Sequence, residues 1–432
     1  MNKLLSRIRN RLNADGTGGI FKNMMILATG TTAAKGIGFL SSLVLTRIFA
    51  PESFGILSLF IAFTSLIAPL STLCYSYAVP LPKSRYMAVN IMMMNLGIII
   101  IMTLLTLAVF LTAGEKIFSM ANAHGLEPYI WLIVLTQFAG GIYETLSSYA
   151  TRVKAFKPIA KTKINQSFIG SAIKILAGFT PLGVTGLLIG QAYAQAGSSF
   201  TYIKVFKEQI KDSLKHITLK RTVRTARFYA DFPMYRLPSQ FLLTFSIQAP
   251  LLLTGKIFGV ATVGQLGLAI SVLSLPVILF GVSAGQAYYA ETAAIGANNP
   301  RKIYDLSKQV AKKLFLLSLI PFIILQAAGE PLFVLVFGKP WHQAGQFASM
   351  LSISLLAQFV VVPIINILTV LGKQKMFLMF NIMRTISIVA VFSACGYFKL
   401  TENKVIFIYS LVLALNYLIM SLSIFRIIRS RF

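Results

Sequence analysis

Six charged residues stand inside long apolar runs of the sequence, where a charge is costly to bury. Four of them are cations and two are acids: Lys35, Lys174, Arg236 and Arg384, with Glu144 and Asp231. A charge at the centre of a bilayer costs on the order of 2.5–3.5 kcal/mol, and such residues usually mark a functional site. Lysine and arginine donate charge-assisted hydrogen bonds to phosphate oxygens. The four cations therefore predict a water-filled central cleft that binds an anionic headgroup such as a diphosphate.

Depth and local sequence leave different alternatives open at these positions. Lys35 lies about 20 Å from the start of its apolar run at ~1.5 Å per residue, which is too deep for its ammonium to reach the interface easily. The glycines and alanines around it predict close helix contact or a cavity wall. Arg384, about 10 Å from its expected cytoplasmic end, could instead reach the headgroups. Asp231 could simply pair with Arg227 or Arg236 at a helix end.

The acids and the uncharged polar residues could serve a transported ligand in other ways. Glu144 or Asp231 could bind a proton or a sodium ion that resets an empty carrier. The polar and aromatic residues that could meet a sugar are Asn90, Asn95, Gln137, Tyr143, Gln191, Tyr193, Gln195, Gln240 and Gln358. Each alone is more often a hydrogen-bond partner between helices, so they predict no sugar site.

The elements that hold these residues must be membrane helices. Of the 432 residues, 56% are hydrophobic and 12% are charged, against about 45–50% and about 25% in soluble domains. The net charge of +28 comes from short segments between apolar runs, which excludes a disordered or nucleic-acid-binding protein. Cys74 and Cys395 both fall within apolar runs, so neither a disulfide framework nor a metal site is expected.

Charged residues and turn signals divide the chain into about twelve spans, since roughly 20 residues cross a bilayer. We place them at residues 21–46, 54–79, 87–112, 128–150, 164–180, 184–203, 228–255, 263–285, 314–337, 346–371, 377–398 and 405–425. Residues 180–183 (TPLG) must turn the chain between the fifth and sixth spans. Thr254, Gly255 and Gly259 separate the seventh from the eighth.

The distribution of lysine and arginine fixes the expected orientation. With the N-terminus inside, 30 of the 40 Lys and Arg residues fall in cytoplasmic segments and 6 fall outside. This is the positive-inside bias, and it requires an even number of spans, so both termini are expected in the cytoplasm. The first 20 residues predict a basic cytoplasmic lead-in rather than a cleaved signal peptide.

An internal repeat indicates two similar halves. Phe49–Leu70 and residues 258–279 share eight identical residues in 22 at a constant offset of 209, including Gly55 and Gly264. Six spans per half give both halves the same orientation, as in transporters with parallel repeats. We therefore expect an N-terminal lobe at 1–206, a basic cytoplasmic linker at 207–227 and a C-terminal lobe at 228–432. Two such lobes could rock about a central cleft.

Enzymatic motifs are missing from the sequence. It contains no Gly-x4-Gly-Lys-[Ser/Thr] nucleotide loop, no HExxH and no Cys/His metal spacing. No external loop exceeds about 15 residues, which disfavours a membrane polymerase or glycosyltransferase. We expect a protein that is not an enzyme and needs no cofactor.

Several stretches resemble one family. They are residues 45–57 (LTRIFAPESFGIL), 78–83 (AVPLPK), 232–276, 286–291 (QAYYAE), 337–341 (FGKPW) and 371–374 (LGKQ). With them the chain resembles the bacterial Wzx-type oligosaccharide flippases of the multidrug/oligosaccharidyl-lipid/polysaccharide exporter superfamily. The resemblance implies an all-α polytopic membrane protein of about twelve helices, with two pseudo-symmetric six-helix lobes in a MATE-like arrangement. These motifs lie at helix entrances and loops, so they indicate the fold rather than any substrate contact.

The resemblance also implies a cargo and a location. The cargo would be an undecaprenyl-diphosphate-linked oligosaccharide, moved to the outer leaflet of the bacterial inner membrane for surface polysaccharide assembly. The expected partners are this cargo, membrane lipids and a polysaccharide polymerase, with no nucleic acid. A cation-coupled multidrug exporter of the same superfamily is the main alternative, although it would need acids deep in its cavity. A phospholipid scramblase also stays open.

Overall fold

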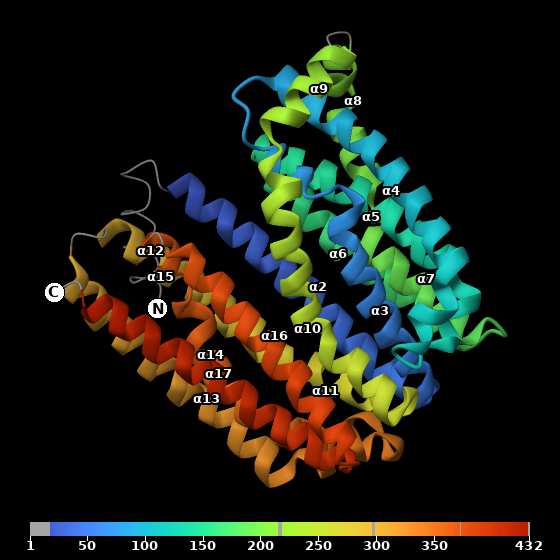
Figure 1. Cartoon of the computed structure of the whole chain (residues 1–432), viewed down its shortest axis with the longest axis vertical. Coiled ribbons are helices and arrows are strands. Elements are labelled where there is room, and N and C mark those ends of the chain that lie inside the picture. The colour runs from blue at the N-terminus through green and yellow to red at the C-terminus, as the bar shows by residue number, and fades with distance from the viewer. Residues whose placement is uncertain (1–17, 215–217, 296–298, 372, 431–432) are drawn as a thin grey trace, which may run out of the picture. The chain divides into compact units, whose positions relative to one another are not determined.

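The computed structural model describes residues 18–214, 218–295, 299–371 and 373–430, and regular structure in these ranges is helical throughout (Figure 1). The first half comprises α2 (Gly18–Ile48), α3 (Pro51–Ser71), the 3-10 helix η1 (Tyr75–Ala78), α4 (Arg85–Ser119), η2 (His124–Tyr129), α5 (Ile130–Arg152), α6 (Phe156–Gly178), α7 (Gly183–Ala196), α8 (Ser199–Leu214) and α9 (Leu219–Phe228). The second comprises η3 (Phe232–Arg236), α10 (Leu237–Phe258), α11 (Val260–Pro276), η4 (Val277–Val282), α12 (Ser283–Ile295), α13 (Pro300–Phe337), η5 (Lys339–Trp341), α14 (His342–Ile364), α15 (Ile367–Val370), α16 (Gln374–Tyr397) and α17 (Glu402–Arg429). The expected all-α fold is confirmed.

Eight helices within the described ranges are long and apolar enough to cross a membrane. They are Pro51–Ser71, Arg85–Ser119, Phe232–Phe258, Val260–Gly281, Pro300–Phe337, Lys339–Ile364, Lys375–Tyr397 and Glu402–Arg429. Four further predicted spans, near α2, α5, α6 and α7, are helical but are not among these eight, and α7 is too short because it has 14 residues. In α6 the reason is plain, because the helix carries four lysines among 23 residues.

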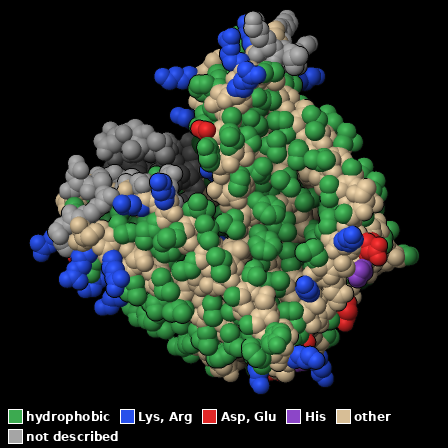
Figure 2. All heavy atoms as spheres, in the orientation of Figure 1, with side chains coloured by type: hydrophobic (Ala, Val, Ile, Leu, Met, Phe, Trp, Pro, Cys, Tyr) green, Lys and Arg blue, Asp and Glu red, His purple; other side chains and the backbone are tan. Residues whose placement is uncertain are grey.

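Apolar side chains cover the lengths of the long helices, as Figure 2 shows, and Lys and Arg gather at helix ends. Leu104 on α4 is 61% exposed, Leu111 71% and Leu335 on α13 74%. Surfaces of this kind belong in hydrocarbon rather than in water.

The second predicted span ends earlier than the apolar run. We expected helix to residue 79, but α3 ends at Ser71 and the chain turns through Leu73 and Cys74, whose φ angles are 47° and 62°. The turn leads into η1, in which Tyr75, Ser76 and Ala78 are buried. Hydropathy does not report this turn because its residues are as apolar as those of the helix.

The sixth predicted span, 184–203, is broken in two. Helix α7 ends at Ala196 and α8 begins at Ser199. A Cβ at Gly197 would lie 2.6 Å from the carbonyl oxygen of Tyr193, and Ser198 has φ 65°. The eighth predicted span also differs, because α11 continues through the π-helical turn η4 into α12 and so extends to Ile295.

By compactness the described chain divides into two units, which we call unit 1 and unit 2. Unit 1 contains residues 18–41, Ile67–Leu111 and Tyr129–Pro238, and unit 2 contains Ser42–Leu66, Thr112–Pro128 and residues 239–430. The predicted lobe boundaries at 206 and 228 stay a prediction.

The core of unit 1 contains aromatic side chains and hydrogen-bonded tyrosine and threonine hydroxyls. Tyr149, Tyr202 and Phe206 are each no more than 1% exposed, and the rings of Tyr149 and Phe206 meet edge to face at 5.3 Å between centroids. The Tyr202 hydroxyl lies 2.9 Å from Thr162 Oγ1, and the Tyr143 hydroxyl lies 3.1 Å from the same atom. This shared hydrogen bonding joins α5, α6 and α8, because buried tyrosine hydroxyls require partners.

In unit 2 the two copies of the repeat pack against each other. A Cβ at Gly55 on α3 would overlap the carbonyl oxygen of Val260, and one at Gly264 on α11 would overlap the carbonyl oxygen of Pro51. Gly55 and Gly264 are 209 residues apart, as are Pro51 and Val260, so the contact is reciprocal. Glycine at both positions lets the two backbones approach closely.

A second set of contacts in unit 2 surrounds Trp341, which is fully buried. Its Nε1 donates to the carbonyl of Thr46 at 3.0 Å, and Arg47 donates to the carbonyl of Leu335 at 2.9 Å. The Gln265 amide donates to the carbonyl of Pro340 at 2.7 Å and accepts from the amide of Ala344 at 2.9 Å. These bonds join the ends of α2, α11 and α13 to the start of α14.

We expect Gln265→Leu to lower the melting temperature of the detergent-purified protein clearly. The change leaves the buried amide of Ala344 without its partner and removes the bond to the carbonyl of Pro340, and an unsatisfied buried group costs about 1–3 kcal/mol. Gln326→Leu is the matched control, since the Gln326 amide donates to Ser349 and Ser352 from an exposed position. Equal melting temperatures for the two variants would contradict the prediction.

Candidate substrate-binding site

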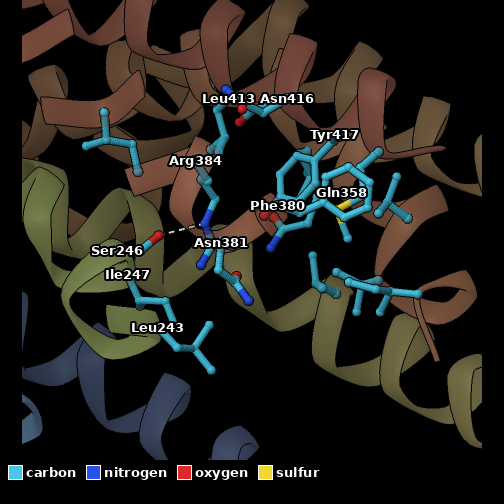
Figure 3. A pocket seen from close by; sticks show the side chains of 18 of the residues that line it. Leu243, Ser246, Ile247, Gln358, Phe380, Asn381, Arg384, Leu413, Asn416 and Tyr417 are labelled. Atoms are coloured by element: carbon cyan, nitrogen blue, oxygen red, sulfur yellow. Dashed lines mark hydrogen bonds between the residues drawn. The ribbon is translucent and has the colours of Figure 1, made fainter. Parts of the chain in front are cut away.

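A cavity of about 470 Å³ lies inside unit 2 (Figure 3). Its walls come from α10, α11, η4, α14, α16 and α17. The apolar lining includes Leu243, Ile247, Ile270, Leu273, Val277, Ile278, Leu351, Leu355, Phe377, Phe380 and Leu413. The polar lining is Ser246, Ser274, Ser354, Gln358, Asn381, Arg384, Tyr409, Asn416 and Tyr417. A few polar groups within a wide apolar wall suit an amphipathic ligand.

Arg384 is the charged residue of this cavity. Its Nε donates to Ser246 Oγ at 2.6 Å, as Figure 3 shows with the two side chains pointing toward each other. Its Nη2 is buried and has no hydrogen-bond partner in the described part of the chain. A buried donor without an acceptor is costly. The described lining contains no Asp or Glu, so an anionic ligand would supply this donor with both an acceptor and a counter-charge.

Asn381 stands one helical turn before Arg384 on α16, and Figure 3 shows the two side chains beside each other. Gln358 and Tyr417 lie on the other side of the view, from α14 and α17. The sequence prediction included Gln358 among many polar residues, but it missed Asn381, Asn416, Tyr417 and Ser246. The three-residue spacing of Asn381 and Arg384 on one apolar helix was the available signal, since such residues share a face.

Lys174 in unit 1 bonds to a neutral partner. Its Nζ donates to Gln191 Oε1 on α7 at 2.7 Å. Its aliphatic stem packs on Gly190, where a Cβ would lie 2.5 Å from Lys174 Cγ. An amide oxygen accepts the hydrogen bond but supplies no counter-charge, and Lys174 has no carboxylate partner among the described residues.

Lys35 on α2 is exposed within unit 1. It lies close enough to Lys163 for the two charges to interact, and Lys163 itself donates to Thr31 Oγ1 at 3.2 Å. None of the four predicted cations forms an ion pair with a carboxylate among the described residues. The one described salt bridge joins His124 to Glu127 at 2.7 Å.

Glu144 and Arg236 converge on η1, the short segment that follows the turn after α3. Ser76 Oγ donates to Glu144 Oε1 at 2.8 Å, and the guanidinium of Arg236 lies over the ring of Tyr77, 4.2 Å from its centroid. A cation–π contact of this kind contributes about 0.5–2 kcal/mol. The structure therefore brings two of the six predicted residues together through neutral partners.

Asp231 is exposed at the start of η3, and its side chain makes no capping hydrogen bond. The alternative in which Asp231 pairs with Arg227 or Arg236 is not formed in the described structure. Of the six predicted residues, Arg384 lies in unit 2 and the other five lie in unit 1.

The family described as "Polysaccharide biosynthesis protein" matches residues 44–346 of the chain. The chain belongs to this polysaccharide biosynthesis family. No curated individual protein matches its sequence.

Solved structures of membrane transporters share the fold of this polysaccharide biosynthesis protein. An inward-facing multidrug resistance MATE family transporter of the MOP superfamily matches with a TM-score of 0.69 at 15% identity, covering 92% of this chain and 95% of the other. The lipid II flippase MurJ in an inward closed conformation gives 0.66 at 13% identity, covering 92% and 87%. The eukaryotic MATE transporter AtDTX14 gives 0.59 at 14% identity, covering 96% and 99%. The expected family and the MATE-like fold are confirmed.

The sites of this polysaccharide biosynthesis protein are therefore set on a transporter fold. Groups that could hold a metal are missing from the described residues, where no three His, Cys, Asp or Glu side chains cluster. Binding in the unit 2 cavity would rest on Arg384, the amide of Asn381 and the surrounding apolar wall. This arrangement can bind and orient an amphipathic anion.

Proposed function

We propose that the chain is a flippase that moves an undecaprenyl-diphosphate-linked oligosaccharide from the inner to the outer leaflet by alternating access. The Nη2 of Arg384 carries the proposal, because among the described residues it is a buried cationic donor without a partner, in an amphipathic cavity whose described lining has no acid. A diphosphate supplies acceptors for it, and a polyprenyl chain suits the apolar wall. Membership in the polysaccharide biosynthesis family supports this class of cargo.

We propose that all four predicted cations serve the phosphate-bearing cargo. Lys35, Lys174, Arg236 and Arg384 have neutral partners or none among the described residues, so no carboxylate there competes with a phosphate for them. A cation-coupled multidrug exporter would need acids facing its drug. Since none is among the described residues that line the unit 2 cavity, the lipid-linked anion is the better candidate.

The membrane potential favours outward movement of such a cargo. With the inside negative, each negative charge moved outward gains about 2.3 kcal/mol per 100 mV. A diphosphate with about two charges would be driven outward by about 4.6 kcal/mol at that potential. Obligatory ion coupling is therefore unnecessary for the forward step.

Alternating access requires an outer contact that opens. Of the turns predicted to face outside, those near residues 49, 122, 259, 338 and 400 all fall in unit 2. The reciprocal glycine contact of α3 with α11 lies at this end. We assign this contact as the outer gate, which separates when the cargo is released.

The deciding experiment follows the cargo. In a bacterium depleted of this protein, radiolabelled lipid-linked oligosaccharide should accumulate in the inner leaflet, where an impermeant oxidant does not reach its sugar. Restoration by the wild-type chain would support the flippase. Normal outer-leaflet exposure during depletion, or restoration of export only for cationic dyes, would contradict it.

We expect Lys35→Ala and Lys174→Ala each to reduce transport strongly while membrane insertion stays intact. Each variant removes a cation that the proposal places against the diphosphate. For Lys174, truncating one partner of a buried charge pair costs about 2–5 kcal/mol, which corresponds to a loss of about 30-fold or more. The loss for Lys35 should be smaller because Lys35 is exposed. Lys339→Ala is the matched control, because Lys339 is exposed at a turn predicted to face outside. Unchanged transport in both variants would remove these residues from the site.

Ion coupling by Glu144 or Asp231 is proposed only for the return of the empty carrier. Flux should be measured in proteoliposomes at clamped potential while the proton and sodium gradients are collapsed separately. We expect one collapse to slow repeated turnover, and Glu144→Gln to abolish that sensitivity because its carboxylate can no longer bind the ion. Equal flux for the wild type and for Glu144→Gln, with either the proton or the sodium gradient collapsed, would exclude coupling.

We also propose that both termini face the cytoplasm at the bacterial inner membrane. A reporter enzyme that works only outside the membrane should be active when it is fused at residues 48, 338 and 400. A reporter that works only in the cytoplasm should be active when it is fused at the C-terminus. A polymerase partner would be captured by crosslinking on the outer side, where the released cargo is consumed.

A further inference from the structure

A second pocket, distinct from the cargo cavity, lies within unit 1 between the start of α4 and α9. It has a volume of about 430 Å³ and is lined by Ser84, Tyr86, Met87, Asn90, Arg221, Arg224, Thr225 and Phe228. We call it the α4–α9 groove. The proposed transport function does not use it.

Helix α9 is held onto α4 and η1 by its inner face. Thr222 Oγ1 donates to Asn90 Oδ1 at 2.8 Å, and the Tyr75 hydroxyl donates to the carbonyl of Ala226 at 3.1 Å. Thr225 is 5% exposed. Threonine and alanine at positions 222, 225 and 226 thus form the attached face, as the helical spacing of three and four residues requires.

The outer face of α9 combines cations with apolar side chains. Arg221, Arg224 and Arg227 are all exposed, Val223 is 45% exposed and Phe228 is 72% exposed. On the α4 side of the groove Tyr86 is 48% exposed. A short basic amphipathic helix with exposed aromatic residues is typical of segments that lie at the membrane interface.

The charge of the groove is one-sided. Two guanidinium groups line it, and its lining among the described residues includes no Asp or Glu. The groove lies at the predicted cytoplasmic ends of the spans 87–112 and 228–255 and at the predicted cytoplasmic linker, and Figure 2 shows Lys and Arg side chains gathered around α8 and α9. The cytoplasmic leaflet supplies anionic phospholipids, which basic juxtamembrane segments attract.

We propose that the α4–α9 groove binds the headgroup of an anionic glycerophospholipid of the cytoplasmic leaflet. Arg221 and Arg224 donate hydrogen bonds to the phosphodiester, since guanidinium groups form bidentate pairs with phosphate. Tyr86 and Phe228 lie against the glycerol and the first methylenes. The bound lipid fixes α9 at the membrane surface.

The test measures lipid binding directly with the full-length protein. Delipidated protein in detergent is titrated with phosphatidylglycerol or with phosphatidylcholine of the same acyl chains, and bound lipids are counted by native mass spectrometry. We expect at least one phosphatidylglycerol to bind in preference to phosphatidylcholine. The double variant Arg221→Gln/Arg224→Gln should bind it about 30-fold more weakly, because each of the two arginines contributes a similar share of the free energy of binding to an anionic headgroup.

The matched control is Arg301→Gln/Lys302→Gln, which removes the same charge from exposed positions at the start of α13. It should bind phosphatidylglycerol as the wild type does. An equal loss in both double variants would mean general attraction by net charge and would overturn the proposal.

A photoreactive phosphatidylglycerol provides a second measurement that does not depend on a variant. We expect its crosslinks to map to residues 84–90 and 221–228. Crosslinks confined to other segments would overturn the site. Displacement of the lipid by water-soluble glycerophosphoglycerol at equal concentration would overturn the assignment to a lipid.

Discussion

Replacing Gly264 by alanine should open the outer end of the transporter. A Cβ at Gly264 would overlap the carbonyl oxygen of Pro51, and the equivalent change at Gly55 would overlap that of Val260. Overpacking of this kind costs about 1–3 kcal/mol, and it affects only the state in which α3 and α11 touch. The equilibrium should therefore shift toward the outward-open state by about 5- to 150-fold.

The measurement uses a cysteine at the contact. Ser58 on α3 is 8% exposed and packs directly on Gly267 of α11, because its hydroxyl would overlap a Cβ added there. In a Cys74→Ser/Cys395→Ser background, Ser58→Cys should react slowly with an external impermeant maleimide. Adding Gly264→Ala or Gly55→Ala should speed the reaction and slow net transport.

Gly97→Ala is the control, because a Cβ at Gly97 on α4 would meet nothing within 4 Å. It should leave both labelling and transport as they are. Unchanged labelling with Gly264→Ala, in protein that still transports, would show that the repeats do not separate at this contact.

Replacing Arg384 by leucine should abolish transport without destabilising the protein. The phosphate of the cargo would lose its buried cation, at a cost of about 2–5 kcal/mol or at least about 30-fold in transport. The folded protein would lose one bond to Ser246 but also a buried donor that has no partner. Apolar replacements of uncompensated buried charges are often neutral or stabilising.

The combination of readouts separates binding from structure. Transport and the melting temperature are measured on the same preparations, with Arg301→Leu as an exposed control and Arg384→Lys as the variant that keeps the charge. We expect Arg384→Lys to retain part of the activity. A large fall in the melting temperature of Arg384→Leu would instead assign Arg384 to the packing of unit 2.

Hydropathy and turn residues predicted much of the fold. The helix around Leu104 and the turn at Gly259 lie where the apolar runs and the glycine place them, because a membrane helix must satisfy its backbone internally. The stop after Ser71 occurs inside apolar sequence, where only tertiary contacts select the turn. The break at Gly197 falls in residues 196–199 (AGSS), a glycine and serine turn signal that the prediction of one continuous span overlooked.

The candidate site was predictable by residue type and not by geometry. The position of Lys174 and Arg384 within apolar runs singled them out, because a charge there is costly to insert and the sequence does not show its partners. Their partners Gln191 and Ser246 come from other helices, and the rotation of each helix about its axis decides them. The repeat likewise identified Gly55 and Gly264 as equivalent, but two equivalent residues need not touch.

The π-helical turn η4 gives the cavity a mechanical property. It begins directly after Pro276 and contributes Val277 and Ile278 to the lining. A π-turn holds one residue more than an α-turn, so its return to α geometry shifts the register by one residue. That shift would rotate α12 by about 100° about its own axis. A cargo molecule that contacts Ile278 in the cavity would thereby favour one rotation of α12, the helix that ends at Ile295.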